Sequence, residues 1–460
     1  MDKKERKFGV QDQIGYFFGD AGGSFVNMYV DAYFLIFCTY VLGINAFFMG
    51  GLFLVARIWD AFNDPMIGSI PDRFCIGKSG DRFKPYVKIV MVPLAIAGIL
   101  CFTNVSGWSM TWKCVWVSVA YILVGMCYTG TSMPYGSLAS VITSDQVERA
   151  KLSRARSFGG ALVSIILALV PQFVYDEDTN PIPSAFLIIA IIFGICSILS
   201  YMFMLHNATE RIHYETNKED YHYGEIIKAV LKNRPLIGTM IAAIGFLFYN
   251  TGFSQLSAYM FKEYYHNTSI ITFATLITMP LMIIIFPLVP ALVRKFGKVK
   301  SVVFPTVIGL VISVFLFVVP ISNPWVYLVL NIFAIAGPMV YALNCWAIVT
   351  DCIDYHEYTT GQRADGSIYS IYTFSRKIGS ALASSFASFS LGLVGYISGI
   401  SSQSAEVAGR IRYLVTAIPM VACLVILIGL GLVYNLKKED SERINEEIKK
   451  RHEESEAKQL

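Results

Sequence analysis

Apolar runs long enough to cross a lipid bilayer recur along the whole chain. A membrane-spanning helix needs about 20 predominantly apolar residues, and a helix satisfies all of its own backbone hydrogen bonds in lipid. The 460 residues are 55% hydrophobic and 15% charged, whereas a soluble domain carries about 25% charged residues. The chain is therefore predicted to be an all-α protein that crosses the membrane many times.

The hydropathy pattern predicts about twelve transmembrane helices, separated into two groups of six by the longest hydrophilic stretch. We expect each group to form a six-helix bundle. The expected spans of the first bundle cover residues 14–41, 44–70, 85–102, 112–138, 157–174 and 184–205, and those of the second cover residues 235–259, 270–293, 301–319, 325–350, 367–400 and 411–433.

Lysine and arginine gather in alternate loops, and the loops between them are short and neutral or acidic. The positive-inside rule therefore places both termini in the cytoplasm, which requires an even number of spans. The charged tail is expected to be solvated and partly helical. The expected parts are a cytoplasmic N-terminus (1–13), an N-terminal six-helix bundle (14–205), a cytoplasmic middle loop (206–234), a C-terminal six-helix bundle (235–435) and a charged cytoplasmic tail (436–460).

Motifs of soluble catalysis are missing from the sequence. It has no P-loop, no HExxH and no GxSxG pattern, and its nine cysteines form no CxxC pair. The net charge of +4 needs no nucleic acid to explain it. We therefore expect no enzyme, no organic cofactor and no nucleic-acid partner.

Two carboxylates lie four residues apart inside the expected second span. Asp60 and Asp64 would share one helix face, with Cβ atoms about 6 Å apart. Two negative charges at bilayer depth are costly unless a cation or a proton neutralises them. Asn63 can add a neutral amide oxygen, so the segment predicts a site for a coupling ion, either Na⁺ or H⁺. The alternative is that Arg57, one turn earlier, pairs with Asp60.

Short motifs follow in a fixed order between about Gly15 and Gly395. Together they resemble the glycoside–pentoside–hexuronide:cation symporters, which include the melibiose and glucuronide carriers. The motifs are Gly19-Asp20, Ala56 to Pro65, Gly80 to Pro85, Pro134 to Leu138, Glu148-Arg149 to Arg156, Asp354 to Tyr358, Gly361 to Arg363, and Arg376-Lys377.

This resemblance implies the major-facilitator fold in a bacterial cytoplasmic membrane and the import of a sugar or glycoside by cation symport. Transport would proceed by alternating access, with the two halves rocking about a site at the midplane. The remaining alternative is a major-facilitator carrier of a peptide, lipid or drug. The expected partners are a small glycoside or sugar acid and membrane lipid, and we expect a monomer.

Several site residues follow from the resemblance rather than from spacing. It adds the Thr129 hydroxyl to the Asp60 and Asp64 cation site. Trp346 could stack on a sugar ring or only pack, and Lys377 could line the cavity or extend to the cytoplasmic side. The residues implied for the sugar site or its cavity are Tyr128, Arg156, Trp346, Arg376 and Lys377.

The chain departs from the melibiose carrier at two positions. Ser24 and Ser132 stand where that carrier has aspartates that hold a neutral galactoside. Without these two anions the cavity is more positive, and a guanidinium such as that of Arg156 suits a substrate carboxylate. We therefore expect an anionic hexuronide or glucuronide, with a neutral pentoside or xyloside as the alternative.

The remaining charged residues have less defined expectations. By resemblance, Asp20 is structural and lies near the cytoplasmic end of the first span. Asp31 could line the cavity, pair with a cation from another span, or face a wall, and the sequence does not decide between these. The loop residues expected to act as gates, or only to set the topology, are Asp72, Arg73, Arg82 and Lys84.

Overall fold

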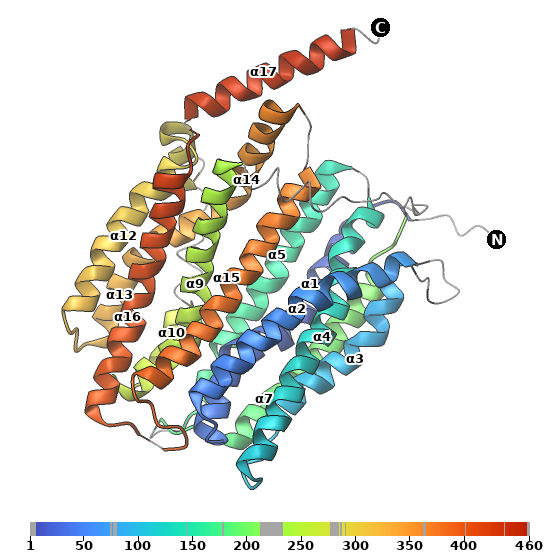
Figure 1. Cartoon of the computed structure of the whole chain (residues 1–460). Coiled ribbons are helices and arrows are strands. Elements are labelled where there is room, and N and C mark those ends of the chain that lie inside the picture. The colour runs from blue at the N-terminus through green and yellow to red at the C-terminus, as the bar shows by residue number, and fades with distance from the viewer. Residues whose placement is uncertain are drawn as a thin grey trace. The chain divides into compact units, whose positions relative to one another are not determined.

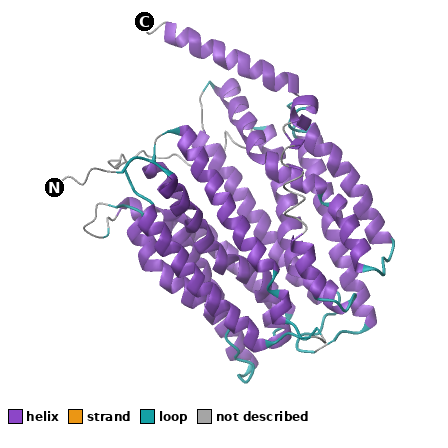
Figure 2. Cartoon of the chain, turned by 180° about the vertical axis from the view of Figure 1, so that it is seen from behind, coloured by secondary structure: helices purple, strands orange, loops and turns teal. Residues whose placement is uncertain are grey.

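Helices make up nearly all of the computed structural model, and Figure 2 draws no strand in it. The expectation of an all-α fold is confirmed for the part of the chain that the structure describes. The described residues are 6–73, 76, 81–143, 145–176, 179–211, 233–276, 285, 288–289, 291–361, 365–400, 402–436 and 438–457.

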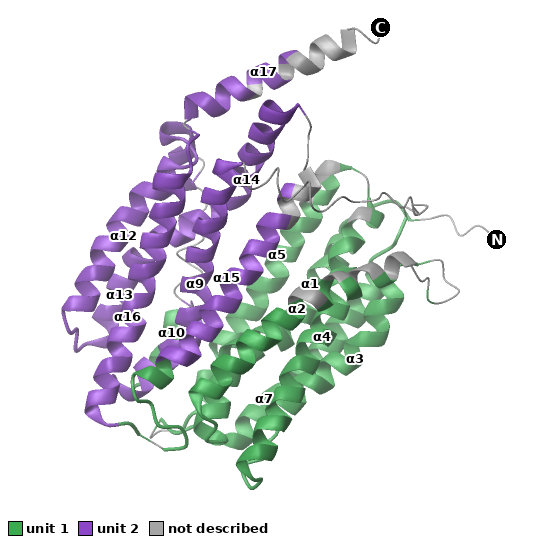
Figure 3. Ribbon diagram, viewed as in Figure 1, with its two compact units in different colours: residues 1–218, 266–275, 391–403 green, residues 219–265, 276–390, 404–460 purple. Residues whose placement is uncertain are grey.

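The chain divides into two compact units (Figure 3). Unit 1 is Met1–Lys218 with His266–Thr275 and Leu391–Gln403, and unit 2 is Glu219–Tyr265, Leu276–Ser390 and Ser404–Leu460. Figure 1 labels the longer helices. In chain order the elements are α1 (Val10–Ile36), the π-helical η1 (Phe37–Val41), α2 (Ala46–Arg73), α3 (Lys84–Cys101), α4 (Met110–Ile142), α5 (Gln146–Ala168), α6 (Pro171–Val174), α7 (Pro183–Asn207), α9 (Arg234–Glu263), α10 (Ser269–Leu276), α12 (Lys300–Val318), α13 (Pro324–Ala334), α14 (Ala336–Thr360), α15 (Asp365–Leu393), α16 (Ala405–Leu427), η2 (Ile428–Val433) and α17 (Lys438–Ala457).

Nine helices among the described residues are long and apolar enough to cross a membrane. Two further helices, α2 and α15, have 28 and 29 residues and are also long enough. Nearly half of the expected span 270–293 lies outside the described residues. The structure therefore agrees with a polytopic membrane protein.

Two helices, α5 and α14, extend about ten residues beyond the spans that hydropathy predicts. The expected fifth span begins at residue 157, but α5 begins at Gln146, because the Asp145 side chain caps the helix by accepting from the Glu148 backbone N–H at 2.9 Å. Likewise α14 continues past residue 350 to Thr360, where Gly361 ends it with a left-handed φ of 72°. Hydropathy detects the apolar part of a helix, so the polar turns at these two helix ends were missed.

The tail helix α17 is amphipathic. Its charged residues surround two isoleucines one turn apart, Ile444 and Ile448, which are buried in the core of unit 2. Lys438, at the start of α17, donates to the Arg294 carbonyl at 3.0 Å. The tail is thus helical, as expected, and one of its sides is packed rather than solvated.

Glycine lets α5 approach α1 closely in unit 1. A Cβ atom at Gly159 would overlap the Phe17 carbonyl oxygen and would lie 3.2 Å from the Asp20 Cβ. Only a residue without a side chain fits there. This contact brings Arg156, one turn earlier on α5, against the polar face of α1.

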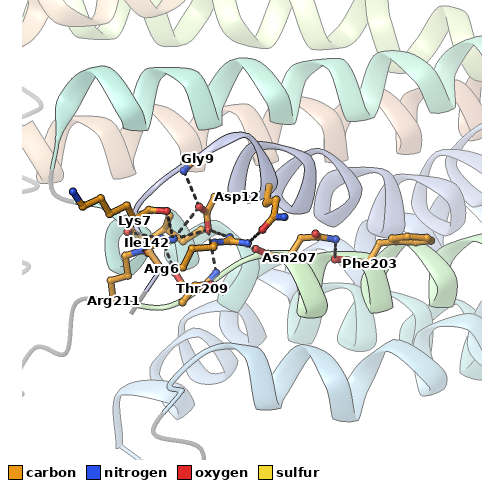
Figure 4. A network of polar contacts seen from close by, with 10 residues as sticks. Arg6, Lys7, Gly9, Asp12, Ile142, Phe203, Asn207, Thr209 and Arg211 are labelled. Carbon is orange, nitrogen blue, oxygen red and sulfur yellow. Dashed lines mark hydrogen bonds and ion pairs between the residues drawn. The ribbon is translucent and has the colours of Figure 1, made fainter. Parts of the chain in front are cut away.

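A buried carboxylate ties several chain segments together at one end of unit 1 (Figure 4). Asp12 of α1 accepts from Arg211 at 2.9 Å and from Arg6 at 2.9 Å, and it also accepts from the Thr209 and Gly9 backbone N–H groups. Arg211 further donates to carbonyl oxygens of the N-terminal segment and of the end of α4. The network therefore fixes the chain that follows α7 against the start of α1.

Candidate functional site

The two carboxylates of α2 both point toward α4. The Thr129 hydroxyl on α4 donates to Asp64 Oδ1 at 2.7 Å, and both side chains are buried. One turn earlier, Asp60 Oδ1 lies opposite Gly125, where a Cβ would be only 3.2 Å away. The structure therefore brings three of the residues predicted for the cation site, Asp60, Asp64 and Thr129, to one seam between two helices.

Asn63 lies beside this seam. It is 6% exposed, and its Nδ2 has no hydrogen-bond partner among the described residues. A 180° rotation of the amide would put an oxygen in place of that nitrogen, and the two atoms are hard to distinguish by shape. The carboxylates, the hydroxyl and this amide together form an oxygen-rich donor set of the kind that hard cations prefer.

Arg57 lies between two carboxylates. Its Nη1 is 3.5 Å from Asp60 Oδ2, and its Nη2 is 3.5 Å from Asp31 Oδ1 on α1. Asp31 also accepts from the Asn27 side chain at 3.0 Å. Of the roles left open for Asp31, the structure supports pairing with a cation from another span.

A second ion pair joins α1 to α5. Arg156 Nε lies 3.0 Å from Asp20 Oδ1, and its guanidinium lies 5.3 Å from the centre of the Tyr135 ring. Ser24 hydrogen-bonds to the same Asp20 carboxylate. The sequence interpretation gave Asp20 a structural role, and the structure makes it the counter-ion of a residue predicted for the sugar site.

Tyr128, a predicted site residue of α4, lies near this pair. Tyr128 packs against Gly23 of α1 together with Tyr201 of α7, since a Cβ at Gly23 would be 3.1 Å from the Tyr128 ring and 2.8 Å from the Tyr201 hydroxyl oxygen. Ser132 follows Tyr128 one turn later and is half-buried. Positions 20, 24, 27 and 31 of α1 share one helix face because they are four, three and four residues apart. This face of α1 is therefore polar along about 16 Å of helix.

The site residues predicted in unit 2 lie on α14 and α15. Trp346 meets Tyr372 edge to face, with ring centres 5.3 Å apart, and the Arg376 guanidinium lies 5.7 Å from the Trp346 ring centre. The Tyr372 hydroxyl is 3.1 Å from that of Tyr341, which in turn donates to the Thr239 carbonyl. Trp346 remains 42% exposed, so its ring is oriented by neighbours and still accessible. Lys377 is exposed on α15.

The predicted gate residues are only partly described. The side chains of Asp72 and Arg73 lie outside the described residues. Arg82 and Lys84 contribute through their backbone, because their N–H groups and that of Phe83 donate to the Glu210 carboxylate at 2.7, 2.9 and 3.0 Å respectively. Lys84 also lies 3.8 Å from Asp81.

Sequence reasoning missed several members of these clusters. The capping role of Glu210 could not be recognised in the sequence, because this residue lies in a hydrophilic stretch far along the chain from α3, the helix that it caps. Tyr372 could have been found from its position one turn before Arg376 on the same helix face. Lys298 and Asp351 were also missed, although they form an ion pair of 2.5 Å in unit 2.

Known transporters are similar to this chain over nearly its whole length. Residues 15–438 match the family described as MFS/sugar transport protein. The glucuronide carrier protein homolog of Escherichia coli (strain K12) is 28% identical over 423 residues, which cover 92% of this chain and 91% of that protein. The isoprimeverose transporter of Lactiplantibacillus pentosus is 26% identical over 420 residues, which cover 89% and 85%.

A solved structure has the same fold. A bacterial homologue of the human lysosomal transporter Spinster, in an inward-facing conformation, superposes with a TM-score of 0.67 at 11% identity, covering 95% of this chain and 97% of that one. The superposition and the family match confirm the expected major-facilitator fold. The family match and the two relatives confirm the resemblance to the glycoside–pentoside–hexuronide:cation symporters.

Proposed function

Because the chain belongs to the MFS/sugar transport protein family, we propose that it imports a sugar or glycoside by symport with Na⁺ or H⁺ through alternating access. The chain is a multi-pass protein of the cytoplasmic membrane, and its relatives are transporters rather than enzymes. The coupling ion binds at Asp60, Asn63, Asp64 and Thr129. Coupling follows from reciprocity, since each ligand raises the affinity for the other by the same factor.

The main support for the ion site is the contact between α2 and α4. Two carboxylates inside a membrane-spanning helix face a buried hydroxyl at 2.7 Å from one of them and a glycine opposite the other. Charges at bilayer depth are expensive, and Arg57, which lies 3.5 Å from Asp60, is shared with Asp31. A cation or proton bound between the two carboxylates would lower the electrostatic cost of placing two acids on one helix face.

We further propose that the sugar is anionic, with a hexuronide or glucuronide as the preferred class. Arg156 remains about half exposed although it contacts Asp20, so its free N–H groups can meet a substrate carboxylate. Tyr128 would donate to hydroxyls, and Trp346 would stack on the sugar ring while Arg376 adds positive charge beside it. A relative is named as a glucuronide carrier homolog, which agrees with this class.

A neutral pentoside or xyloside is the second candidate. The observation that favours it is the Asp20 carboxylate 3.0 Å from Arg156, which already neutralises that guanidinium. The relative named as an isoprimeverose transporter agrees with this class, because isoprimeverose is an uncharged xylose-containing sugar.

The test is uptake into proteoliposomes under separate Na⁺ and pH gradients, with labelled glucuronide and labelled xyloside. Uphill accumulation driven by one of the two ions is expected, and Asp60→Asn and Asp64→Asn should each abolish accumulation while some sugar exchange remains. Asp176→Asn, in the loop after α6, is the matched control and should accumulate as the unmodified protein does. Accumulation by the Asp60→Asn/Asp64→Asn double variant at the normal level would overturn the cation site, and transport of xyloside alone would end the anionic class.

A further inference from the structure

A line of alternating charges runs from α1 to the acid pair of α2. Asp31 on α1 is followed by Arg57 on α2, and Arg57 is followed by Asp60 one turn further along α2. Asn27, one turn before Asp31, donates to Asp31 Oδ2 at 3.0 Å and holds that carboxylate from its other side. The same arginine is thus shared between an acid outside the proposed cation site and an acid inside it.

The distances show that Arg57 does not form a close ion pair with Asp60. Both of its contacts measure 3.5 Å, whereas a charge-assisted N–H···O bond is about 2.7–2.9 Å long. The guanidinium therefore lies between the two carboxylates, and its Nε makes no hydrogen bond within the described residues. Arg57 is 27% and Asp31 38% exposed at the side chain, so a small rotation could bring the arginine fully onto either acid.

Arg57 and an incoming cation compete for the same carboxylate. Asp60 presents Oδ2 to Arg57, and its Oδ1 lies opposite Gly125. If Arg57 paired fully with Asp60, the site would lose one of its two negative charges before any cation arrived. A negative charge on the far side of Arg57 opposes this pairing, and Asp31 is placed there.

We propose that Asp31 is a positioning residue that neutralises Arg57 and thereby keeps Asp60 available to the coupling cation. The inference rests on the proposed function, and it adds a residue that touches neither the cation nor the sugar. It also predicts the direction in which each substitution changes the affinity for the cation. Removing Asp31 leaves an excess positive charge beside the cation site, whereas removing Arg57 leaves an excess negative charge there.

The experiment compares Asp31→Asn, Arg57→Gln and the double variant in proteoliposomes. Sugar uptake is measured against NaCl, with choline chloride replacing it, and against a pH series in Na⁺-free buffer. We expect Asp31→Asn to raise the half-saturating cation concentration about tenfold or more and Arg57→Gln to lower it, because one unit charge a few ångströms from a partly buried site has an effect of this size. The double variant has the net charge of the unmodified protein and should return to within about threefold of it.

The rescue separates this role from a structural one. If Asp31 only helped the helices to pack, its loss would reduce the amount of folded protein or the maximal rate, and adding Arg57→Gln would not restore the cation constant. Asp31→Glu, which keeps the charge, should stay close to the unmodified protein. If Asp31→Asn fails to fold, Arg57→Gln alone still tests the proposal, because the half-saturating cation concentration should fall in this variant.

The outcomes distinguish this inference from the function on which it rests. Unmodified protein whose uptake ignores both Na⁺ and pH would overturn the symport proposal and this inference with it. Cation-dependent uptake with an unchanged constant in Asp31→Asn, or a double variant as poor as Asp31→Asn, would overturn the inference alone.

Discussion

Thr129→Val removes one hydroxyl from the seam between α2 and α4 and keeps the shape of the side chain. The hydroxyl donates to Asp64 Oδ1 at 2.7 Å, and both residues are buried. A hydrogen bond to a charged group contributes about 1.5–3 kcal/mol, and ~1.4 kcal/mol corresponds to a tenfold change in a binding constant. The substitution should therefore change cation binding about tenfold, and its direction should reveal the coupling ion.

The sign follows from what each ion needs. With Na⁺, the hydroxyl oxygen is a ligand, so its loss should raise the half-saturating Na⁺ concentration about tenfold. With H⁺, the hydroxyl stabilises the ionised carboxylate, so its loss favours protonation and should move the pH profile of uptake upward by about one unit. The assay is sugar uptake into proteoliposomes at a series of Na⁺ concentrations and at a series of pH values.

Two matched variants control the measurement. Thr129→Ser keeps the hydroxyl and should stay within about twofold of the unmodified protein. Thr131→Val makes the same substitution two residues along α4, where the hydroxyl donates to the Tyr128 carbonyl instead of to an acid, so the cation constants should not change. If Thr129→Val left both the Na⁺ constant and the pH profile unchanged, the hydroxyl would have no part in the ion site, and the reasoning above would be refuted.

Two further predictions concern the sugar and the fold. Trp346→Leu should raise the KM for sugar roughly fivefold to tenfold at saturating cation, because stacking and the Arg376 contact are lost. Trp346→Phe keeps an aromatic ring and should raise the KM less. A lower yield of protein with an unchanged KM would indicate that Trp346 only packs against its neighbours. Glu210→Ala should lower the free energy of unfolding in detergent by about 2 kcal/mol, since three backbone N–H groups at the start of α3 lose their acceptor. Glu406→Ala removes an exposed ion pair with Arg410 and should lower the free energy of unfolding by less than about 1 kcal/mol. If the two variants lost the same free energy, the capping role of Glu210 would be contradicted.

Hydropathy and helical spacing were sufficient to predict the all-α class and the acid pair of α2. Both signals are local, because a run of apolar residues and a four-residue spacing can be recognised within one helix. The start of α5 was missed for the same reason. Its first turns carry Glu148, Arg149 and Lys151, and these charged residues show no apolar period.

The partners of the charged residues could not be predicted from local signals. Asp31 and Arg57 are 26 residues apart, and Asp20 and Arg156 are 136 residues apart. Which acid meets which base depends on how the helices pack, and that packing depends on close contacts such as the one at Gly159. Glu210 acts on the start of α3 from a similar distance along the chain, so its role emerged only from the fold.

The two acids of α2 are not equivalent, although the sequence presents them as a pair. Asp64 is buried and accepts a hydrogen bond from the Thr129 hydroxyl, whereas Asp60 shares Arg57 with Asp31 and lies opposite Gly125. In the proposed ion site, Asp64 would therefore be the fixed carboxylate, and the charge of Asp60 would depend on where Arg57 lies. Because Arg57 links Asp60 to the polar face of α1, where Ser24 and Asp20 also lie, a group bound on that face can influence the ion through one guanidinium. This link would provide a physical route for the reciprocal coupling that the proposed symport requires.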